Sequence, residues 1–227
     1  MKCALIIFTR VPKPGQTKTR LEKMLTKEEC ASLHENMIRD EAALTDTKQW
    51  DTFVYYTPAD AQERIIELIP GAMGYEPQRD VEFGTRMSEC IGEILDRGYG
   101  ACVLIGTDIP AINKDIIEKA FAILDKEDVV IGATEDEGYY LIGMKILHKG
   151  IFANQTYGTG SVYQDTLEKI RDCECSYGTL SVLRDIDEPE DLKEYWTCRA
   201  DRYPEMEHTW KYLKQLHDRY DLSKERT

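Results

Sequence analysis

The sequence lacks long hydrophobic runs. Its first apolar run, Ala4–Phe8, is too short to cross a membrane and ends at Thr9 and Arg10. The small-residue cleavage site of a signal peptide is also missing. We therefore expect a cytoplasmic protein without a membrane partner.

Basic residues are scarce beyond the first 23 positions. That segment holds six cations and one acid, whereas the rest has 23 basic and 41 acidic residues, and the net formal charge is −13. This balance excludes the broad positive surface that nucleic acids and anionic membranes require. A small polyanion such as a nucleotide remains compatible with the basic segment.

The seven cysteines lack the arrangement of a disulfide framework. Their number is odd and several lie within apolar patterns, which is typical of reduced thiols in a cytosolic core. Only one residue separates Cys173 from Cys175, and no second pair follows, so we do not expect a structural zinc ion.

The chain also lacks repeats, low-complexity segments and linkers. Its 227 residues predict one core: a domain over residues 1–200, with residues 201–227 as a helical extension of it. The extension carries an amphipathic pattern at Met206, Trp210, Leu213, Leu216 and Tyr220. This pattern predicts a helix that closes the fold or supplies a face for a homodimer.

Apolar runs typical of buried strands alternate with helical patterns along the chain. The strand-like runs cover 4–8, 52–57, 101–106, 128–133, 139–144 and 180–184, and helical patterns include 26–46, 87–97, 114–124 and 161–171. The alternation predicts an α/β sandwich with a mostly parallel sheet. Because the fourth and fifth runs are too close for a helical crossover, we expect one edge of the sheet to be mixed or interrupted.

The loop after the first strand lacks the signature of a P-loop, because Thr17 stands where glycine precedes the lysine of that motif. The dinucleotide fingerprint is missing as well, since Tyr163 takes the place of the third glycine after Gly158 and Gly160. The first of these absences argues against a Walker-type ATPase.

The same loop, residues 11–21, has a glycine and three cations directly after a buried strand. Amides near Gly15, together with Lys18 and Arg20, predict a phosphate site at the carboxyl edge of the sheet. A solvated basic loop is the alternative that the pattern leaves open.

Asp108 directly follows another buried strand and is well placed for a divalent ion. Mg²⁺ or Mn²⁺ needs only one or two carboxylates when substrate phosphates complete its shell. Asp185 and Asp187 are candidates to complete the site, because alternate residues of an extended chain point the same way. An Asx turn at Asp108 and a helix cap by Asp187 with Glu190 are the structural alternatives.

Three acids crowd between two apolar runs at Glu135, Asp136 and Glu137. Such crowding favours a pocket for a polar substrate or an exposed acidic turn. The loop 157–161, Tyr-Gly-Thr-Gly-Ser, predicts either a substrate loop or a helix cap. The four histidines form no evident triad, so we assign them no catalytic role.

Six segments of the chain, taken in order, resemble a known family. They read VPKPGQTKTRL, FGTRM, VLIGTDIPAI, EDEGYYLIGM, YGTGSV and DIDEPEDL. Over about residues 3–195 the chain is similar to nucleotide-diphospho-sugar-transferase-like proteins, of the type described as glycosyltransferases linked to arsenosugar biosynthesis. The resemblance implies a Rossmann-like three-layer sandwich of glycosyltransferase-A type, and more distant kinship with 2-phospholactate and molybdenum-cofactor guanylyltransferases.

The resemblance also implies roles for residues. Lys18 and Arg20 would contact phosphates, Asp108 would hold the metal, and Asp187 would be a second carboxylate. We further expect phosphate binding by Arg10, Lys13, Gly15 and Arg86, catalysis by Asp108, Lys18 and Asp136, and an acceptor loop of Glu135, Gly138, Tyr139, Gly158 and Thr159.

The chain departs from the family pattern in three motifs. Glu137 precedes Gly138 where two glycines are usual, Tyr157 replaces a tryptophan, and Phe83-Gly-Thr-Arg86 replaces Leu-Gly-Glu-Arg. These changes fall in loops expected on the acceptor side, so they bear on the acceptor more than on the nucleotide.

Three functions follow as hypotheses. The first is metal-dependent transfer of a sugar from a nucleotide-diphosphate donor to a small-molecule acceptor. The second is nucleotidyl transfer from a nucleoside triphosphate to a phosphorylated small molecule, with release of pyrophosphate. The third is a nucleotide-binding module without turnover, which the altered loop at 135–138 suggests.

Overall fold

In the computed structural model, which describes residues 1–158, 160–198 and 203–223, seven strands form one sheet in the order β3-β2-β1-β4-β6-β5-β7. The strands are β1 (Cys3–Arg10), β2 (Asp51–Thr57), β3 (Gly74–Pro77), β4 (Ala101–Ile105), β5 (Val129–Ala133), β6 (Tyr139–Met144) and β7 (Tyr177–Thr179). The α-helices are α1 (Lys27–Glu41), α2 (Gln62–Leu68), α3 (Phe83–Asp96), α4 (Lys114–Leu124), α5 (Val162–Asp172), α6 (Pro189–Cys198) and α7 (Glu207–Tyr220).

The sheet is mixed and mostly parallel, as the sequence predicts. β6 is antiparallel to both of its neighbours, β4 and β5, while the other pairs are parallel. The antiparallel strand therefore lies inside the sheet, and the expectation that the mixed or interrupted part is an edge is wrong. The turn between β5 and β6 is short, with the Thr134 N–H donating to the Gly138 carbonyl at 3.0 Å. β6 therefore runs back beside β5, and its other edge pairs with β4.

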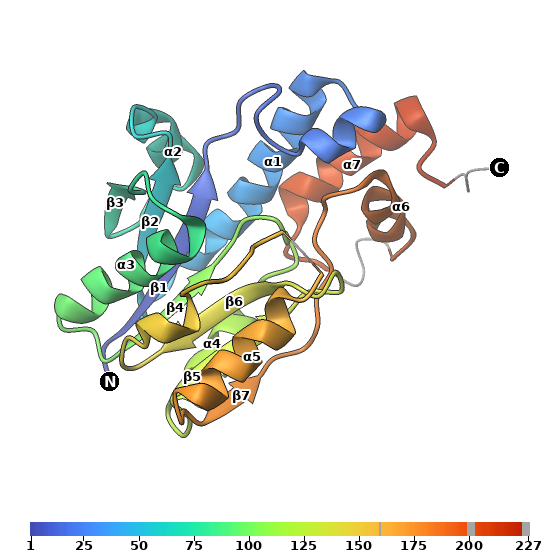
Figure 1. Cartoon of the computed structure of the whole chain (residues 1–227). Helices are drawn as coiled ribbons and strands as arrows, with labels where there is room; N and C mark the ends of the chain where they lie inside the picture. Colours follow the sequence, from blue (N-terminus) through green and yellow to red (C-terminus); the bar gives the residue numbers. More distant parts are fainter. Residues whose placement is uncertain (159, 199–202, 224–227) are drawn as a thin grey trace.

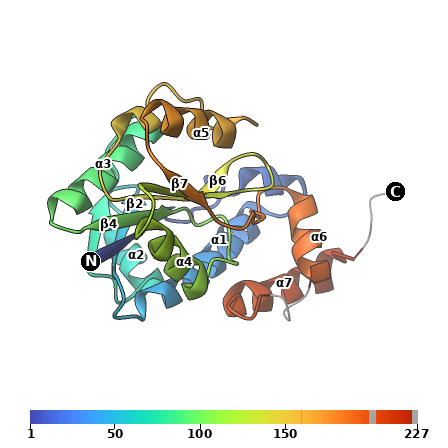
Figure 2. The ribbon, with the colours of Figure 1, turned by 90° about the horizontal axis from the view of Figure 1, so that it is seen from below.

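Helices cover both faces of the sheet (Figure 2). Alternate residues of β1 supply the two cores: Leu5 and Ile7 pack with α1, α2 and α4, whereas Ala4, Ile6 and Phe8 pack with α3 and α5. This alternation is the period of two that a strand imposes on its side chains. The result is a three-layer α/β sandwich.

The C-terminal helix α7 packs along α1 (Figure 1). Leu213 and Leu216 are buried in the core on the α1 face of the sheet. The carboxylate of Asp40 at the end of α1 accepts hydrogen bonds from the N–H groups of His208 at 2.7 Å and Thr209 at 2.8 Å. The apolar residues that suggested a dimer face are therefore used within the chain.

Three elements differ from the sequence expectations. β3 and α2 are missed, since a strand of Gly-Tyr-Glu-Pro has little intrinsic strand preference and a helix of seven residues shows few turns of periodicity. β7 covers 177–179 instead of 180–184, although the Leu183 N–H still donates to the Ala133 carbonyl at 3.1 Å. Within the described ranges, no helix combines the length and apolar character needed to span a membrane.

Candidate functional site

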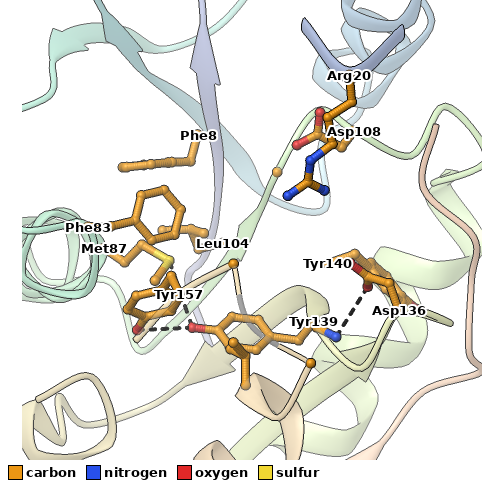
Figure 3. A pocket seen from close by; sticks show the side chains of 15 residues that line it. Phe8, Arg20, Phe83, Met87, Leu104, Asp108, Asp136, Tyr139, Tyr140 and Tyr157 are labelled. Carbon is orange, nitrogen blue, oxygen red and sulfur yellow. Dashed lines mark hydrogen bonds between the residues drawn. The ribbon is translucent and has the colours of Figure 1, made fainter. Parts of the chain in front are cut away.

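Two adjacent cavities open where β1 and β4 end. The first, here called the cationic cavity, has a volume of about 330 Å³, and the second, the aromatic cavity, about 550 Å³. The cationic cavity is lined by Phe8, Thr9, Arg10, Gln16, Thr17, Lys18, His34, Thr57, Gln78, Phe83, Arg86, Gly106, Thr107, Asp108 and Asp187. The aromatic cavity is lined by Phe8, Arg20, Phe83, Met87, Leu104, Gly106, Asp108, Asp136, Gly138, Tyr139, Tyr140, Tyr157, Gly158, Gly160 and Val162 (Figure 3). Ends of parallel strands are where ligands bind in open α/β sheets.

Asp108 lies in the wall that the two cavities share, and it pairs with Lys18. Lys18 has a left-handed backbone conformation with φ of 50°, directly before a short 3₁₀ helix. Protein atoms around the Asp108 carboxylate disfavour its charge, yet 60% of its side-chain surface stays open. The nearby ammonium of Lys18 prevails and holds the pKa of Asp108 below its ordinary value. Asp108 is therefore an anion whose exposed side chain lines both cavities.

A buried network of hydroxyl and imidazole groups supports this pair. His34 of α1 contacts the hydroxyl of Thr17 at 2.5 Å through Nδ1 and that of Thr107 at 3.0 Å through Nε2. The Thr9 and Thr107 hydroxyls lie 2.8 Å apart. Burial, and then the positive charge of Lys18, lowers the pKa of His34 to about 4, so the imidazole is neutral at pH 7. This network links the loop before Lys18 to the loop that carries Asp108.

Sequence reasoning gave His34 no role. His34 lies on the same helical stripe as Leu33, Met37 and Ile38, so its position predicts only burial. The polar partners come from residues 17 and 107, which no local pattern connects to α1. Only their hydrogen bonds in three dimensions identify His34 as part of the wall of the cationic cavity.

Asp187 reaches the same cavity from the C-terminal half of the chain. The Ile186 N–H donates to the Asp108 carbonyl at 2.9 Å, which brings the two segments together. The Asp187 carboxylate accepts a hydrogen bond from Arg20 at 2.5 Å. The carboxylate of Asp191, in the first turn of α6, accepts hydrogen bonds from the N–H groups of residues 187 and 188, at 3.0 and 2.7 Å.

Asp185 lines neither the cationic nor the aromatic cavity. It lines a smaller acidic hollow with Glu135, Asp136 and Asp187. Burial, and then the nearby charge of Asp136, raises the pKa of Asp185 to about 6. Of the three carboxylates expected to bind metal, the structure brings Asp108 and Asp187 into one cavity and leaves Asp185 in the next.

The donor set fits a sparse magnesium or manganese site. Both ions accept carboxylate oxygens and are often held by one or two carboxylates together with substrate phosphates. Asp108 and Asp187 offer such oxygens at one cavity. Across the residues with described positions, no cluster of three or more His, Cys, Asp or Glu side chains forms a complete cage.

The residues predicted to bind phosphate do not all lie at the same cavity. Arg10, Lys18 and Arg86 line the cationic cavity, whereas Arg20 lines the aromatic cavity. The Arg86 Nε–H donates to the Val81 carbonyl at 2.7 Å. Lys13 and Gly15 line neither cavity and instead form a turn, in which the Gln16 N–H donates to the Lys13 carbonyl at 3.0 Å.

One wall of the aromatic cavity is built from rings on separate segments. Phe8 and Phe83 meet edge to face with centroids 5.7 Å apart, and Phe83 meets Tyr157 at 4.9 Å. The hydroxyls of Tyr139 and Tyr157 lie 3.5 Å apart, and the Tyr139 hydroxyl is 3.9 Å from the Met87 sulfur (Figure 3). Edge-to-face packing of this kind holds rings in defined positions.

The acidic loop contributes one carboxylate to the aromatic cavity. Asp136 accepts hydrogen bonds from the Thr134 hydroxyl at 2.5 Å and the Gly138 N–H at 3.2 Å. Glu135 turns away to pair with Arg184. The expected acceptor residues Gly138, Tyr139 and Gly158 line the aromatic cavity, and Thr159 lies outside the described residues.

Comparison of the whole fold gives relatives of known structure. A candidate nucleotide-diphospho-sugar transferase from Desulfovibrio desulfuricans G20 is similar, with 29% identity, a TM-score of 0.88 and 97% of each chain covered. A cytidylyltransferase from Leptospira borgpetersenii is 14% identical, with a TM-score of 0.57 over 100% of this chain and 98% of that one. A CMP:2-keto-3-deoxy-manno-octonic acid synthetase solved with CTP is 13% identical, with a TM-score of 0.54 over 88% and 99%.

These likenesses establish a fold of nucleotide-diphospho-sugar transferase type, as the sequence motifs imply. No protein of curated function matches the chain. A family model described as an uncharacterized protein conserved in bacteria (DUF2064) matches residues 40–159, which include Asp108, Asp136 and Tyr157. Since this match spans more than half of the sequence, the chain belongs to the DUF2064 family.

Proposed function

We propose that the protein transfers a sugar from a nucleotide-diphosphate donor to a small-molecule acceptor, with a divalent ion bound at Asp108. One observation carries this proposal: Asp108 lies in the wall shared by a cationic cavity and an aromatic cavity. A transferase needs two substrate sites that meet where the bond is exchanged. The donor phosphates would occupy the cationic cavity, and the acceptor the aromatic one.

The cations of the donor side have a direct role in this proposal. Arg10, Lys18 and Arg86 would bind the diphosphate. Fixed positive charge next to the leaving diphosphate stabilises the negative charge that develops on it. His34 and Thr107 would position Lys18 and Asp108 through the buried network.

The metal site of the proposal uses Asp108 and Asp187. A magnesium or manganese ion bound there would supply further charge stabilisation to the leaving diphosphate. On the acceptor side, Asp136 is held by two hydrogen bonds and faces the aromatic cavity. We assign it the role of the base that takes the proton from the acceptor hydroxyl.

Nucleotidyl transfer is the second candidate, and the number of cations is compatible with it. Three cationic side chains around one cavity suit a triphosphate as well as a diphosphate. Its second substrate, however, would bring a phosphate into the aromatic cavity. Arg20 is the cation among the described residues lining that cavity, and it already pairs with Asp187. Glycosyl transfer to an uncharged acceptor therefore fits the lining better.

Product analysis tests the choice between the reactions. The protein would be incubated with nucleotide-sugars or nucleoside triphosphates, with Mg²⁺ or Mn²⁺ and a mixture of small hydroxylated acceptors. Release of nucleoside diphosphate from a nucleotide-sugar supports glycosyl transfer, whereas pyrophosphate from a triphosphate supports nucleotidyl transfer. Metal-dependent binding without either product would support the module without turnover.

Two variants make this test specific to the site. Lys18→Met removes a cation from the cationic cavity, and we expect it to abolish turnover. Lys13→Ala removes a cation from the same loop outside both cavities, so turnover should persist. The arsenosugar-associated type, the cytoplasmic location and a homodimer remain predictions from the sequence alone.

A further inference from the structure

We propose that the aromatic cavity selects an acceptor with an uncharged, planar apolar body and presents its reacting hydroxyl to Asp136. The inference rests on the proposed function, because it names the chemical class of acceptor for that reaction. It goes beyond the sequence motifs, which left the acceptor undefined.

The first argument is the chemistry of the wall that Phe8, Phe83 and Tyr157 form, here called the inner wall. Phe83 and Tyr157 are in edge-to-face contact, and Met87 and Leu104 extend the apolar surface beside them. Aromatic faces and a flexible thioether attract planar apolar ligands through ring stacking and sulfur contacts. A polyol such as glycerol has no planar ring to stack against this wall.

The second argument is the separation of polar from apolar groups. The carboxylates of Asp108 and Asp136 and the guanidinium of Arg20 lie away from the Phe8–Phe83–Tyr157 wall (Figure 3). Burial raises the pKa values of the Tyr139 and Tyr157 hydroxyls, so both remain neutral at the inner wall. A ligand with an apolar body and one hydroxyl end matches this polarity.

The third argument concerns size and charge. A volume of about 550 Å³ is within the range of pockets that enclose drug-sized molecules. A phosphate placed against the inner wall would lose its hydration without gaining a cation there, which is unfavourable. The cavity therefore discriminates against phosphorylated acceptors by the cost of desolvating their charge.

The test uses three probes on the whole 227-residue chain. 2-Naphthol has a planar apolar body and one hydroxyl, 2-naphthyl phosphate adds a charge to the same rings, and glycerol has hydroxyls without the rings. Binding would be measured by calorimetry and saturation-transfer NMR. We expect 2-naphthol to bind, and the other two probes to bind at least roughly tenfold more weakly or not at all.

Variants of Tyr157 assign the binding to this cavity. Tyr157→Ala should weaken 2-naphthol roughly five- to tenfold, whereas Tyr157→Phe, which keeps the ring, should bind within about threefold of the parent. Met73→Ala removes an apolar side chain that is 63% exposed and lies outside the cavity, so it serves as the control. Thermal unfolding of each variant checks that it is folded.

The outcomes separate this inference from the proposed function. Tighter binding of 2-naphthyl phosphate than of 2-naphthol, or no response to Tyr157→Ala, would overturn the inference. Competition between 2-naphthol and a nucleotide-sugar would also overturn it, because the cavity would then take the nucleobase. Failure of all nucleotides to bind while 2-naphthol still binds through Tyr157 would instead contradict the proposed function.

Discussion

Lys18 and Asp108 form an ion pair whose members differ strongly in exposure: 2% of the Lys18 side chain is exposed, against 60% of the Asp108 side chain. Loss of the carboxylate charge leaves a buried ammonium without its partner, whereas loss of the ammonium leaves an anion that water can reach. The two partners therefore contribute unequally to stability.

The first prediction follows from this asymmetry. Asp108→Asn should lower the free energy of unfolding by about 1–3 kcal/mol, and Lys18→Met by less than about 1 kcal/mol, because only the former strands a buried charge. Urea denaturation at pH 7 measures both. The exposed pair Lys23–Glu188 supplies the control, since Lys23→Met should have a small effect. Equal losses in the two main variants would contradict the explanation.

The second prediction concerns pH. The pKa of His34 is lowered to about 4 in the folded protein by burial and by Lys18, with Arg10 adding to the effect and Asp108 opposing it. The ordinary pKa of a histidine side chain is about 6.5. Between these values the unfolded chain binds more protons, so folding stability contributed by His34 is present above about pH 6.5 and is lost as the pH falls toward 4.

His34→Gln removes this titration and keeps hydrogen-bonding groups. Relative to the parent, its stability profile from pH 6.5 to 4 should be flatter by up to about 1.4 kcal/mol per pH unit. Chemical denaturation at half-unit steps of pH provides the data, and parallel profiles for His34→Gln and the parent would refute a buried neutral imidazole.

The third prediction compares two glycines of α3. A Cβ atom at Gly84 would lie 2.5 Å from the Phe152 carbonyl oxygen and 2.9 Å from the Tyr157 hydroxyl, whereas at Gly92 it would meet only the tip of Leu147 at 3.0 Å. Gly84→Ala should therefore destabilise the fold by about 1–3 kcal/mol. Gly92→Ala should be neutral or stabilising by up to about 1 kcal/mol, because alanine favours the helix and Leu147 can move.

Thermal and urea unfolding of the two alanine variants test this difference. Binding of 2-naphthol to Gly84→Ala is a second readout, since the displaced backbone or tyrosine lies at the aromatic cavity. Similar stability of both variants would mean that the helix does not approach residues 152 and 157 as closely as described.

Much of the fold follows from local patterns in the sequence. α1 begins where the helical pattern over 26–46 predicts, and a capping box marks its start: the Glu29 N–H donates to the Thr26 hydroxyl at 3.2 Å, and the Thr26 N–H donates to the Glu29 carboxylate at 2.8 Å. The α/β alternation is equally local. Both are short-range features that a single segment encodes.

The order of strands and the composition of the cavities depend on contacts between distant segments. Arg20 and Asp187 are 167 residues apart, and the aromatic wall joins residues 8, 83 and 157. Asp108 was accessible to sequence reasoning because it directly follows a strand. His34 was not, because the same apolar stripe accommodates a core histidine with no polar partners.

The fourth prediction concerns the attachment of α7. Asp40 is 7% exposed and accepts hydrogen bonds from two N–H groups at the start of that helix. Asp40→Ala should lower the free energy of unfolding by about 1–2 kcal/mol, as for loss of a helix cap. Hydrogen exchange should be faster at the start of α7 in this variant.

Asp218 lies on the exposed side of the same helix, and Asp218→Ala is the matched control. It should leave both stability and hydrogen exchange near residues 207–210 at parental values. Unchanged exchange in Asp40→Ala would show that α7 is held by its apolar face alone.

The most direct test of the proposed function is metal-dependent nucleotide binding at Asp108. Thermal stability would be measured with nucleotide-sugars and nucleoside triphosphates, each with and without Mg²⁺ or Mn²⁺, because a ligand that binds the native state raises the unfolding temperature. The proposal predicts stabilisation by at least one nucleotide-sugar that requires the metal and is lost in Asp108→Asn. Stabilisation that persists in folded Asp108→Asn, or none with any nucleotide, would contradict it.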